Sequence, residues 1–208
     1  MRVVLTGFVP FPGVEINPAQ LVVERVSAKV KDGSFQMRSA FELTAEVLPT
    51  AFQSAGVRIR ELIRDIDPDI VISLGVAARR DAICLERFAL NVNDAPKPDN
   101  DGVLANGEPI VVNGPDAYRS TLPIESLHKA IQECNIPVKF SNHAGAYVCN
   151  HVFYSARDEI EQSGSNAKCG FIHIPMHREA EGHPFAGNGL PIDTLVEAVL
   201  CCLEVLTT

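Results

Sequence analysis

Apolar positions along the 208-residue chain follow two alternating patterns. Short, continuously apolar runs are typical of strands buried on both faces of a parallel sheet, and longer amphipathic stretches between them are typical of helices. Strands are expected at Arg2–Thr6, Phe35–Leu48, Asp67–Gly75 (after an initial turn), Ile83–Val92, Ile136–Phe140 and Gly170–Pro175. Helices are expected at Ala19–Ala28, Thr50–Ile66, Ile124–Glu133, His151–Arg157 and Pro191–Leu206.

Strands and helices therefore alternate along most of the chain. This order predicts an α/β fold: one domain over residues 1–208, built as a three-layer α/β/α sandwich around a mixed, mainly parallel, twisted sheet. Asn17-Pro18 is a typical helix start, and Thr50 is expected to cap the second helix. The Pro-, Gly-, Asn- and Asp-rich segment Asp94–Pro115 is a long loop, with a short hairpin expected at Pro109–Val112. Its length makes it a candidate active-site or interface loop.

Charge and composition narrow the classes of partner. The formal net charge is −8, and no block of Lys or Arg could follow a phosphate backbone, so neither nucleic acid nor a membrane surface is expected as a partner. No apolar run is long enough for a membrane span, and the first residues do not resemble a signal peptide, so a cytoplasmic protein is expected. The six cysteines form no CxxC pair and are expected to be free thiols rather than disulfides or zinc ligands.

One cysteine stands where a nucleophile would be placed. The segment Ser141-Asn-His-Ala-Gly-Ala-Tyr-Val-Cys149-Asn150 joins a short strand to a helix and puts Cys149 near the helix start. Backbone N–H groups and the helix dipole stabilise a thiolate there, and the thiolate is the attacking species. The alternative is a small buried side chain that packs the helix on the sheet.

Two strand residues could assist this thiol. His173, between Ile172 and Ile174, could accept the thiol proton and later protonate a leaving amine, or could be a hydrogen-bonded core histidine. Glu86 lies in a mostly apolar strand, where a carboxylate is costly unless paired. It would orient and charge-stabilise the histidine, or else form an ion pair with Arg87 or Arg79.

The sequence resembles the pyroglutamyl peptidase type I (pyrrolidone carboxyl peptidase) family of cysteine peptidases. The resemblance runs in order from Thr6 to Pro175. It is carried by Leu5-Thr-Gly-Phe-Val-Pro-Phe-Pro-Gly13 with Asn17-Pro18, by residues 75–91, 94–100 and 141–150, and by Gly170-Phe-Ile-His-Ile-Pro175. It implies an exopeptidase that removes N-terminal L-pyroglutamate through an acyl-enzyme. The nucleophile falls on Cys149, the base on His173 and the acid on Glu86. No cofactor or metal is implied, and the family tends to form dimers and tetramers.

The resemblance also implies a pocket for the flat, neutral lactam ring. Phe8 and Phe11 would form aromatic walls, Asn17 would order the loop, and Val76 and Val148 would face the substrate. A pair of Phe residues three apart is otherwise more often core packing, and Asn17 could equally be a helix cap.

Four positions depart from the family pattern. Val76 replaces a glutamine of some relatives, Cys84 a Ser or Thr, and Pro12 the first glycine of Phe-Gly-Gly. Pro96 stands where an arginine usually lies near the oxyanion site, with Lys97 as the adjacent positive charge. This last change concerns the rate more than the reaction type, because backbone N–H groups can still hold an oxyanion.

Two other classes of function are compatible with the residues. A metal-dependent hydrolase could use clustered histidines, yet Pro175 between His173 and His177 disfavours the helix that a zinc motif needs. A non-catalytic binding protein could keep the triad on the same fold. Chelator and thiol-reagent sensitivity separates the two enzymes, and measurable turnover excludes the binding protein.

Overall fold

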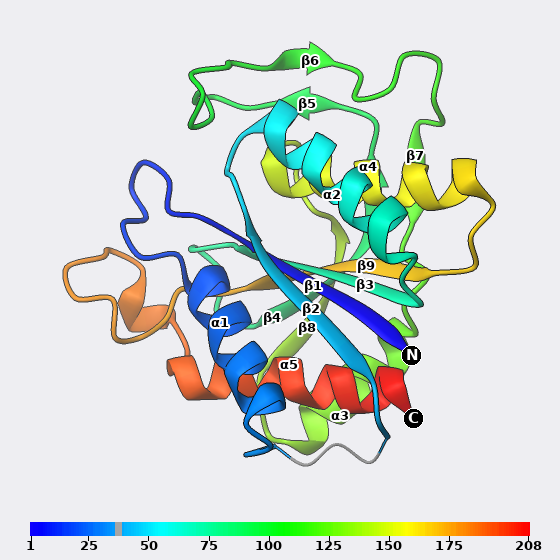
Figure 1. Cartoon of the computed structure of the whole chain (residues 1–208). Coiled ribbons are helices and arrows are strands. Elements are labelled where there is room, and N and C mark those ends of the chain that lie inside the picture. Colours follow the sequence, from blue (N-terminus) through cyan, green and yellow to red (C-terminus); the bar gives the residue numbers. More distant parts are fainter. Residues whose placement is uncertain (36–38) are drawn as a thin grey trace.

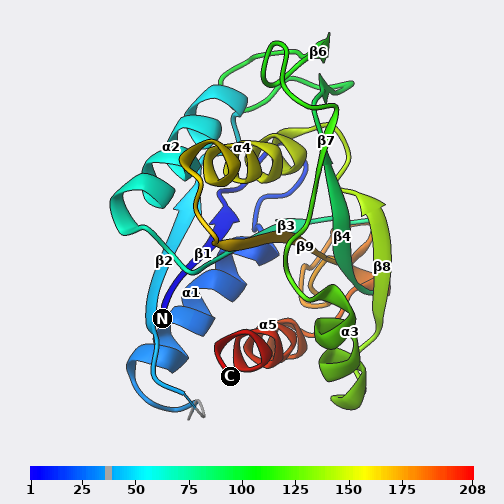
Figure 2. The same cartoon turned by 90° about the vertical axis from the view of Figure 1, so that its right-hand side faces the viewer.

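The computed structural model describes residues 1–35 and 39–208. A mixed, mainly parallel sheet forms its centre, with helices on both faces (Figures 1 and 2). The strands are β1 (Arg2–Phe8), β2 (Glu42–Leu48), β3 (Ile70–Val76), β4 (Ile83–Leu90), β5 (Asn93–Asp94), β6 (Asn106–Glu108), β7 (Ala117–Arg119), β8 (Val138–His143) and β9 (Lys168–Ile174). The helices are α1 (Pro18–Lys31), α2 (Phe52–Ile66), α3 (Ile124–Glu133), α4 (Val148–Ser163) and α5 (Ile192–Thr207), and a short 3₁₀ turn covers Ala186–Asn188.

The main sheet has the order β2-β1-β3-β9-β4-β7, and β8 pairs with β4 off this path. Phe88 of β4 stands opposite Arg119 of β7 and also opposite His143 of β8, so these two strands lie on opposite edges of β4. β2, β1, β3 and β9 run parallel to one another. β4 turns back antiparallel to β9, and β8 then runs parallel to β4. The first residues of β4 therefore lie beside the carboxyl ends of β3 and β9, where active groups collect in α/β sheets.

Two apolar layers hold the helices on the sheet. Helices α1, α3 and α5 cover one face, while α2 and α4 cover the other (Figure 2). β1 and β3 are buried along almost their full length, which explains their continuous apolar runs. The expected three-layer α/β/α architecture with a mixed, mainly parallel sheet is confirmed.

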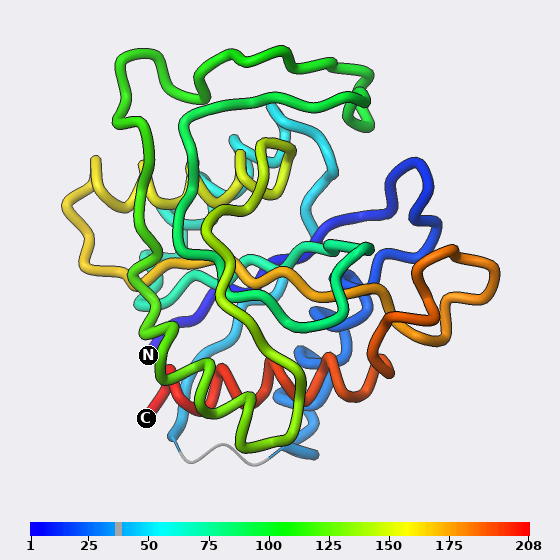
Figure 3. The backbone as a smooth tube through the Cα atoms, turned by 180° about the vertical axis from the view of Figure 1, so that it is seen from behind, coloured from blue at the N-terminus to red at the C-terminus, as the bar shows by residue number. Residues whose placement is uncertain are grey.

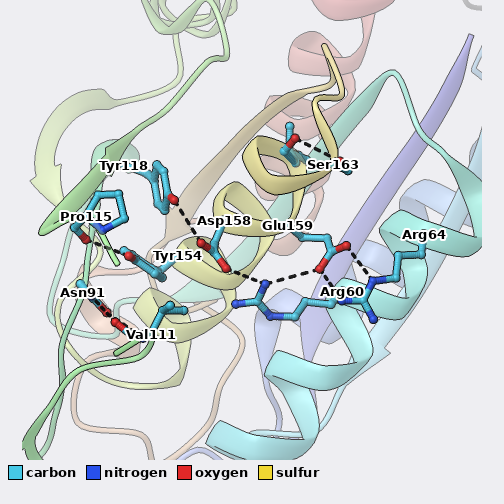
Figure 4. Close-up of polar contacts among 11 residues, drawn as sticks. Arg60, Arg64, Asn91, Val111, Pro115, Tyr118, Tyr154, Asp158, Glu159 and Ser163 are labelled. Atoms are coloured by element: carbon cyan, nitrogen blue, oxygen red, sulfur yellow. Dashed lines mark hydrogen bonds and ion pairs between the residues drawn. The ribbon is translucent and has the colours of Figure 1, made fainter. Parts of the chain in front are cut away.

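Ion pairs and hydrogen bonds fix α4 against α2 and β7 (Figure 4). The Asp158 carboxylate accepts hydrogen bonds from Arg60 at 2.8 Å and from the Tyr118 hydroxyl at 3.0 Å. Glu159 accepts two from Arg64, at 2.7 and 2.6 Å. Because α4 begins beside the candidate nucleophile, this network also limits where that helix start can move.

The loops after β1 and β9 lie at the same end of the sheet, as Figures 1 and 3 show from opposite sides. Their contact is apolar: Val14 of the first loop packs with Met176 and Ala180 of the second. Phe11 and Val76 pack against this small cluster. The two loops and the end of β3 thus form one wall beside the carboxyl edge of the sheet.

Several expected boundaries are wrong. Thr50 does not cap α2: its hydroxyl donates to the Val9 carbonyl, and Ala51 occupies the N-cap position without a side-chain bond. The carboxylate of Asp99, 47 residues away, accepts from the first helical N–H, that of Phe52, at 2.8 Å. The cap of α2 therefore comes from Asp99, which is distant in sequence, and not from the neighbouring Thr50.

A strand was expected at Phe35–Leu48, but β2 begins only at Glu42. Residues 36–38, which belong to the expected strand, lie outside the described residues. No strand forms at Pro109–Val112; β6 lies just before it and pairs with β5. β7 was not expected, and α4 is longer than His151–Arg157 at both ends. The start of α1 at Pro18 is confirmed, with the Asn17 side chain accepting from the Ala19 N–H at 3.0 Å. Across residues 1–35 and 39–208, no helix is both long and apolar enough to cross a membrane.

Candidate active site

Strand register brings the candidate base and acid together. His173 of β9 stands opposite Cys84 of β4, so Glu86, two residues further along β4, is its diagonal neighbour on the same face. A long side chain can reach across such a diagonal. His173 Nδ1 and Glu86 Oε1 lie 2.8 Å apart, and both residues are buried.

On its other side, His173 stands opposite Gly75 of β3. A methyl group added to Gly75 would lie 2.7 Å from Cys149 Sγ and 2.8 Å from Phe171 Cζ. The sulfur therefore lies over the empty position left by Gly75, next to His173. Cys149 is the second residue of α4, and this helix packs on the face of the sheet that carries Phe171. The structure thus brings Cys149, His173 and Glu86 into one constellation from three separate elements.

The electrostatic setting of Cys149 differs from that of an exposed thiol at a helix start. Burial, together with the negative charge of Glu86, raises the pKa of Cys149 to about 12. A backbone hydrogen bond at the helix start and the charge of Arg80 oppose this shift without overcoming it. The expected stabilisation of the thiolate is therefore present but outweighed, and the resting thiol is protonated at neutral pH.

Glu86 stays ionised although its side chain has no exposed surface. Burial alone would raise its pKa, but the hydrogen bond and charge of His173 and the charge of Arg80 outweigh burial and lower the pKa below its usual range. Arg80 Nη1 lies 2.8 Å from Glu86 Oε1. The ion-pair partner is therefore Arg80, and neither Arg87 nor Arg79 takes this place: Arg87 bonds Asn142, and the guanidinium of Arg79 lies over the Phe185 ring.

Arg80 was missed as a functional candidate from sequence. It lies in the turn between β3 and β4, which carries no periodic pattern, and only its short spacing to Glu86 hinted at a contact. The side chain of Ser141, opposite Glu86 on β8, was also missed, although it lies in the motif before the nucleophile.

A pocket of about 380 Å³ adjoins the start of α4. Its lining is mostly apolar and includes Ala146 and Tyr147, the two residues before Val148. The remaining lining comes from the loop after β1 and from the long loop after β4, namely Phe11, Pro12, Asp94, Ala95, Pro96, Lys97 and Pro98. Pro96, expected to replace an arginine near the oxyanion site, and the adjacent Lys97 thus lie beside the nucleophile's helix, and both are exposed.

The expected pocket residues occupy different depths. Phe8 is 3% exposed, and its ring centroid lies 6.3 Å from that of Phe171, so most of its ring belongs to the core. Val148 is fully buried under the helix start. Val76 keeps some exposed surface at the end of β3. Asn17 caps α1 and also donates to the Val9 carbonyl at 3.1 Å, which fixes the loop that carries Phe11.

Three other histidines contact groups outside this constellation. His151 Nδ1 lies 3.0 Å from Asn93 Oδ1, and burial lowers the pKa of the imidazole to about 4. His143 Nδ1 accepts from the Gly145 N–H, and His183 Nδ1 from the Phe185 N–H. Within the described part of the chain, no group of three or more His, Cys, Asp or Glu residues is arranged to hold a metal ion. All six cysteines are free thiols, as expected.

Comparison with known proteins agrees with this geometry. The model of the family described as "Pyroglutamyl peptidase" matches residues 1–208. A pyrrolidone-carboxylate peptidase of Oceanobacillus iheyensis is 45% identical over 210 residues, covering 98% of this chain and 99% of the relative. One from Thermococcus onnurineus is 39% identical over 199 residues, covering 95% and 94%.

Solved structures resemble the whole fold as well. Pyrrolidone carboxyl peptidase from Pyrococcus furiosus superposes with a TM-score of 0.89 at 34% identity, covering 99% of this chain and 97% of that one. Pyroglutamyl peptidase I from Bacillus amyloliquefaciens gives a TM-score of 0.86 at 35% identity, covering 98% and 95%.

Proposed function

Since the chain belongs to the pyroglutamyl peptidase family, cysteine peptidases that remove N-terminal pyroglutamate, we propose that Cys149, His173 and Glu86 perform this reaction here. The observation that carries the proposal is the hydrogen bond of His173 Nδ1 to buried Glu86, on the strand beside the sulfur of Cys149. The ionised carboxylate accepts the Nδ1–H, which leaves Nε2 as the lone-pair nitrogen that can take a proton.

The high thiol pKa sets how the reaction begins. Because the resting thiol is protonated, Cys149 Sγ loses its proton to His173 Nε2 as it attacks the exocyclic carbonyl carbon of the pyroglutamyl residue. The resulting imidazolium is stabilised by the Glu86 carboxylate. The first N–H groups of α4 have no partner within the helix and can bind the developing oxyanion.

Collapse of the tetrahedral intermediate breaks the scissile C–N bond. His173 returns its proton to the leaving amine, and a thioester between Cys149 and the pyroglutamyl group remains. A water molecule then gives a proton to His173 and attacks the thioester carbonyl. Release of pyroglutamic acid restores the Cys149 thiol and the neutral histidine.

The proposed lactam pocket lies beside the start of α4. Phe11 and Val76 would contact the ring directly, Phe8 would contribute its edge, Val148 would support the floor, and Asn17 would keep the loop in place. Apolar walls suit an uncharged ring, whereas an α-ammonium group would lose its hydration without gaining a partner. The substrate class is therefore peptides with an N-terminal pyroglutamyl residue.

The organisation of the chain and its assembly belong to the same proposal. Residues 1–208 would act as a single peptidase domain, in homodimers or homotetramers, and in the cytoplasm.

A chromogenic pyroglutamyl-aminoacyl amide tests the function. We expect release of the chromophore by the parent protein and loss of that activity after iodoacetamide treatment, with the label on Cys149. Cys149→Ser should fold normally and be inactive. Absence of turnover by a folded, reduced protein would favour a binding protein. Inactivation by EDTA that zinc reverses would favour a metal hydrolase.

A further inference from the structure

The guanidinium group of Arg80 joins three elements next to the candidate triad. Nη1 donates to Glu86 Oε1 of β4 at 2.8 Å, and Nη2 donates to Ser141 Oγ of β8 at 3.1 Å. Its own backbone N–H donates to the Ala77 carbonyl at 2.8 Å, which closes the turn after β3. The side chain is 34% exposed, so it covers Glu86 from the solvent side.

Glu86 needs such a partner because it is fully enclosed. Oε1 carries both polar contacts, to His173 and to Arg80, whereas Oε2 has no hydrogen-bond partner among the described residues. An enclosed carboxylate with so few partners would take up a proton unless positive charge held it ionised. A protonated Glu86 would be a poorer acceptor for His173 Nδ1–H and could not stabilise an imidazolium.

We propose that Arg80 is a positioning residue for the peptidase reaction, an inference that rests on the proposed function of Cys149, His173 and Glu86. Its positive charge keeps Glu86 anionic, and its hydrogen bond fixes the oxygen that receives His173 Nδ1–H. Arg80 touches neither the substrate nor the reacting atoms in this scheme. It acts on the reaction only through Glu86.

A purely structural role makes different predictions. If the Arg80 side chain only tied β4 to β8, its loss would lower stability and leave the pH profile in place. If it positions Glu86, removing its charge raises the pKa of Glu86, because the Arg80 charge helps to lower it. The acid limb of the kcat/KM profile then moves to higher pH. Among the described residues, the other charged or titratable groups facing this pair are the thiols of Cys149 and Cys84. The ammonium of Lys139 lies beyond Cys84 and already pairs with Asp81.

The central variants are Arg80→Met and Arg80→Lys, assayed on a pyroglutamyl amide from pH 4.5 to 9. For Arg80→Met we expect kcat to fall roughly 10- to 100-fold, with KM changed less than about threefold. Its acid limb should move up by roughly one pH unit. Arg80→Lys should recover most of kcat and return the limb toward the parent position. Arg79→Met and Arg87→Met remove the same charge from neighbouring residues and should leave both quantities nearly unchanged.

Adding Arg80→Met to a Glu86→Gln protein tests whether Arg80 acts through Glu86. If Arg80 acts through Glu86, adding Arg80→Met to Glu86→Gln should change kcat by less than about threefold. The pH dependence of Cys149 alkylation by iodoacetamide gives a second readout that needs no turnover. It should shift in Arg80→Met as the kinetic profile does.

These measurements separate the two levels of inference. A parent protein without turnover, whose alkylation profile still responds to Arg80, would overturn the proposed function and retain the coupling of Arg80 to the triad. Two results with the central variants would overturn the role of Arg80: a parent-like pH profile in Arg80→Met, or no recovery of kcat in Arg80→Lys. Two further results would also overturn it: an equal loss of kcat when Arg80→Met is added to Glu86→Gln, or equal losses of kcat in Arg79→Met and Arg87→Met. Should Arg80→Met not fold, Arg80→Gln, which keeps donors without the charge, is measured in its place.

Discussion

Gly75 offers a sharp test of where the nucleophile lies. In Gly75→Ala, the new methyl carbon would lie 2.7 Å from Cys149 Sγ and 2.8 Å from Phe171 Cζ. Ordinary contact begins near 3.5 Å, so the sulfur or the strand must move by about 0.8 Å. Crowding of this kind costs about 1–3 kcal/mol of stability. A catalytic group displaced by about 1 Å can lose about 100-fold in rate. We therefore expect kcat to fall on the order of 100-fold.

Gly170→Ala is a matched control on the adjacent strand. Its methyl carbon would lie 2.6 Å from both Ser120 Oγ and Leu122 Cδ1, an overlap as severe as that at Gly75 but away from Cys149. Both variants should lose stability, at roughly 2–4 °C in Tm for each kcal/mol in a chain of this size. Only Gly75→Ala should lose most of its kcat on a pyroglutamyl amide. Full activity in a folded Gly75→Ala protein, or equal losses of activity in the two variants, would refute the placement of Cys149 beside His173.

Other perturbations separate catalysis, binding and stability. His173→Ala should abolish turnover, while His177→Ala should keep most of it; equal losses would contradict the assignment of the base. The pKa of His151, about 4 against an ordinary 6.5, means that the folded state favours the neutral ring. Stability present above about pH 6.5 should therefore fall as the pH drops toward 4, by up to about 3 kcal/mol, and urea titrations of His151→Gln should show a weaker pH slope. Phe11→Ala should raise KM and leave Tm nearly unchanged. Phe8→Ala should raise KM and also lower Tm, because the Phe8 ring is in the core. With matched amides, pyroglutamyl should exceed glutaminyl substrates at least roughly a thousandfold in kcat/KM, and similar rates would indicate a general aminopeptidase.

Local signals in the sequence were sufficient for most elements of the fold. Buried strands such as β3 are mostly apolar because helices cover both faces of the sheet. The start of α1 could be read from Asn17-Pro18 because the capping bond joins residues only two apart. His173 and Glu86 stood out for the same local reason, since each is a polar residue in an apolar strand.

What the sequence did not reveal depends on contacts between distant segments. The cap of α2 comes from Asp99, which the chain brings back through its long loop, and the nearby Thr50 bonds elsewhere. The partner of Glu86 was placed at Arg79 or Arg87 by proximity in sequence, whereas the turn after β3 aims Arg80 at it. Strand pairing, too, decides that His173 is the diagonal neighbour of Glu86, and no periodicity within either strand contains that register.

The protonation state of the nucleophile follows from this same arrangement. A cysteine at a helix start suggests a ready thiolate, yet burial and the charge of Glu86 raise the pKa of Cys149 to about 12, which favours the protonated thiol. The Glu86 carboxylate that contacts His173 Nδ1 also opposes ionisation of Cys149. In the proposed mechanism, Cys149 gives its proton to His173 as it attacks, so the orientation of His173 matters to the reaction. Orientation is what the strand register, Glu86 and the Arg80 contact provide, and this is why the acid and its arginine should matter to a reaction whose bond-forming atom belongs to Cys149.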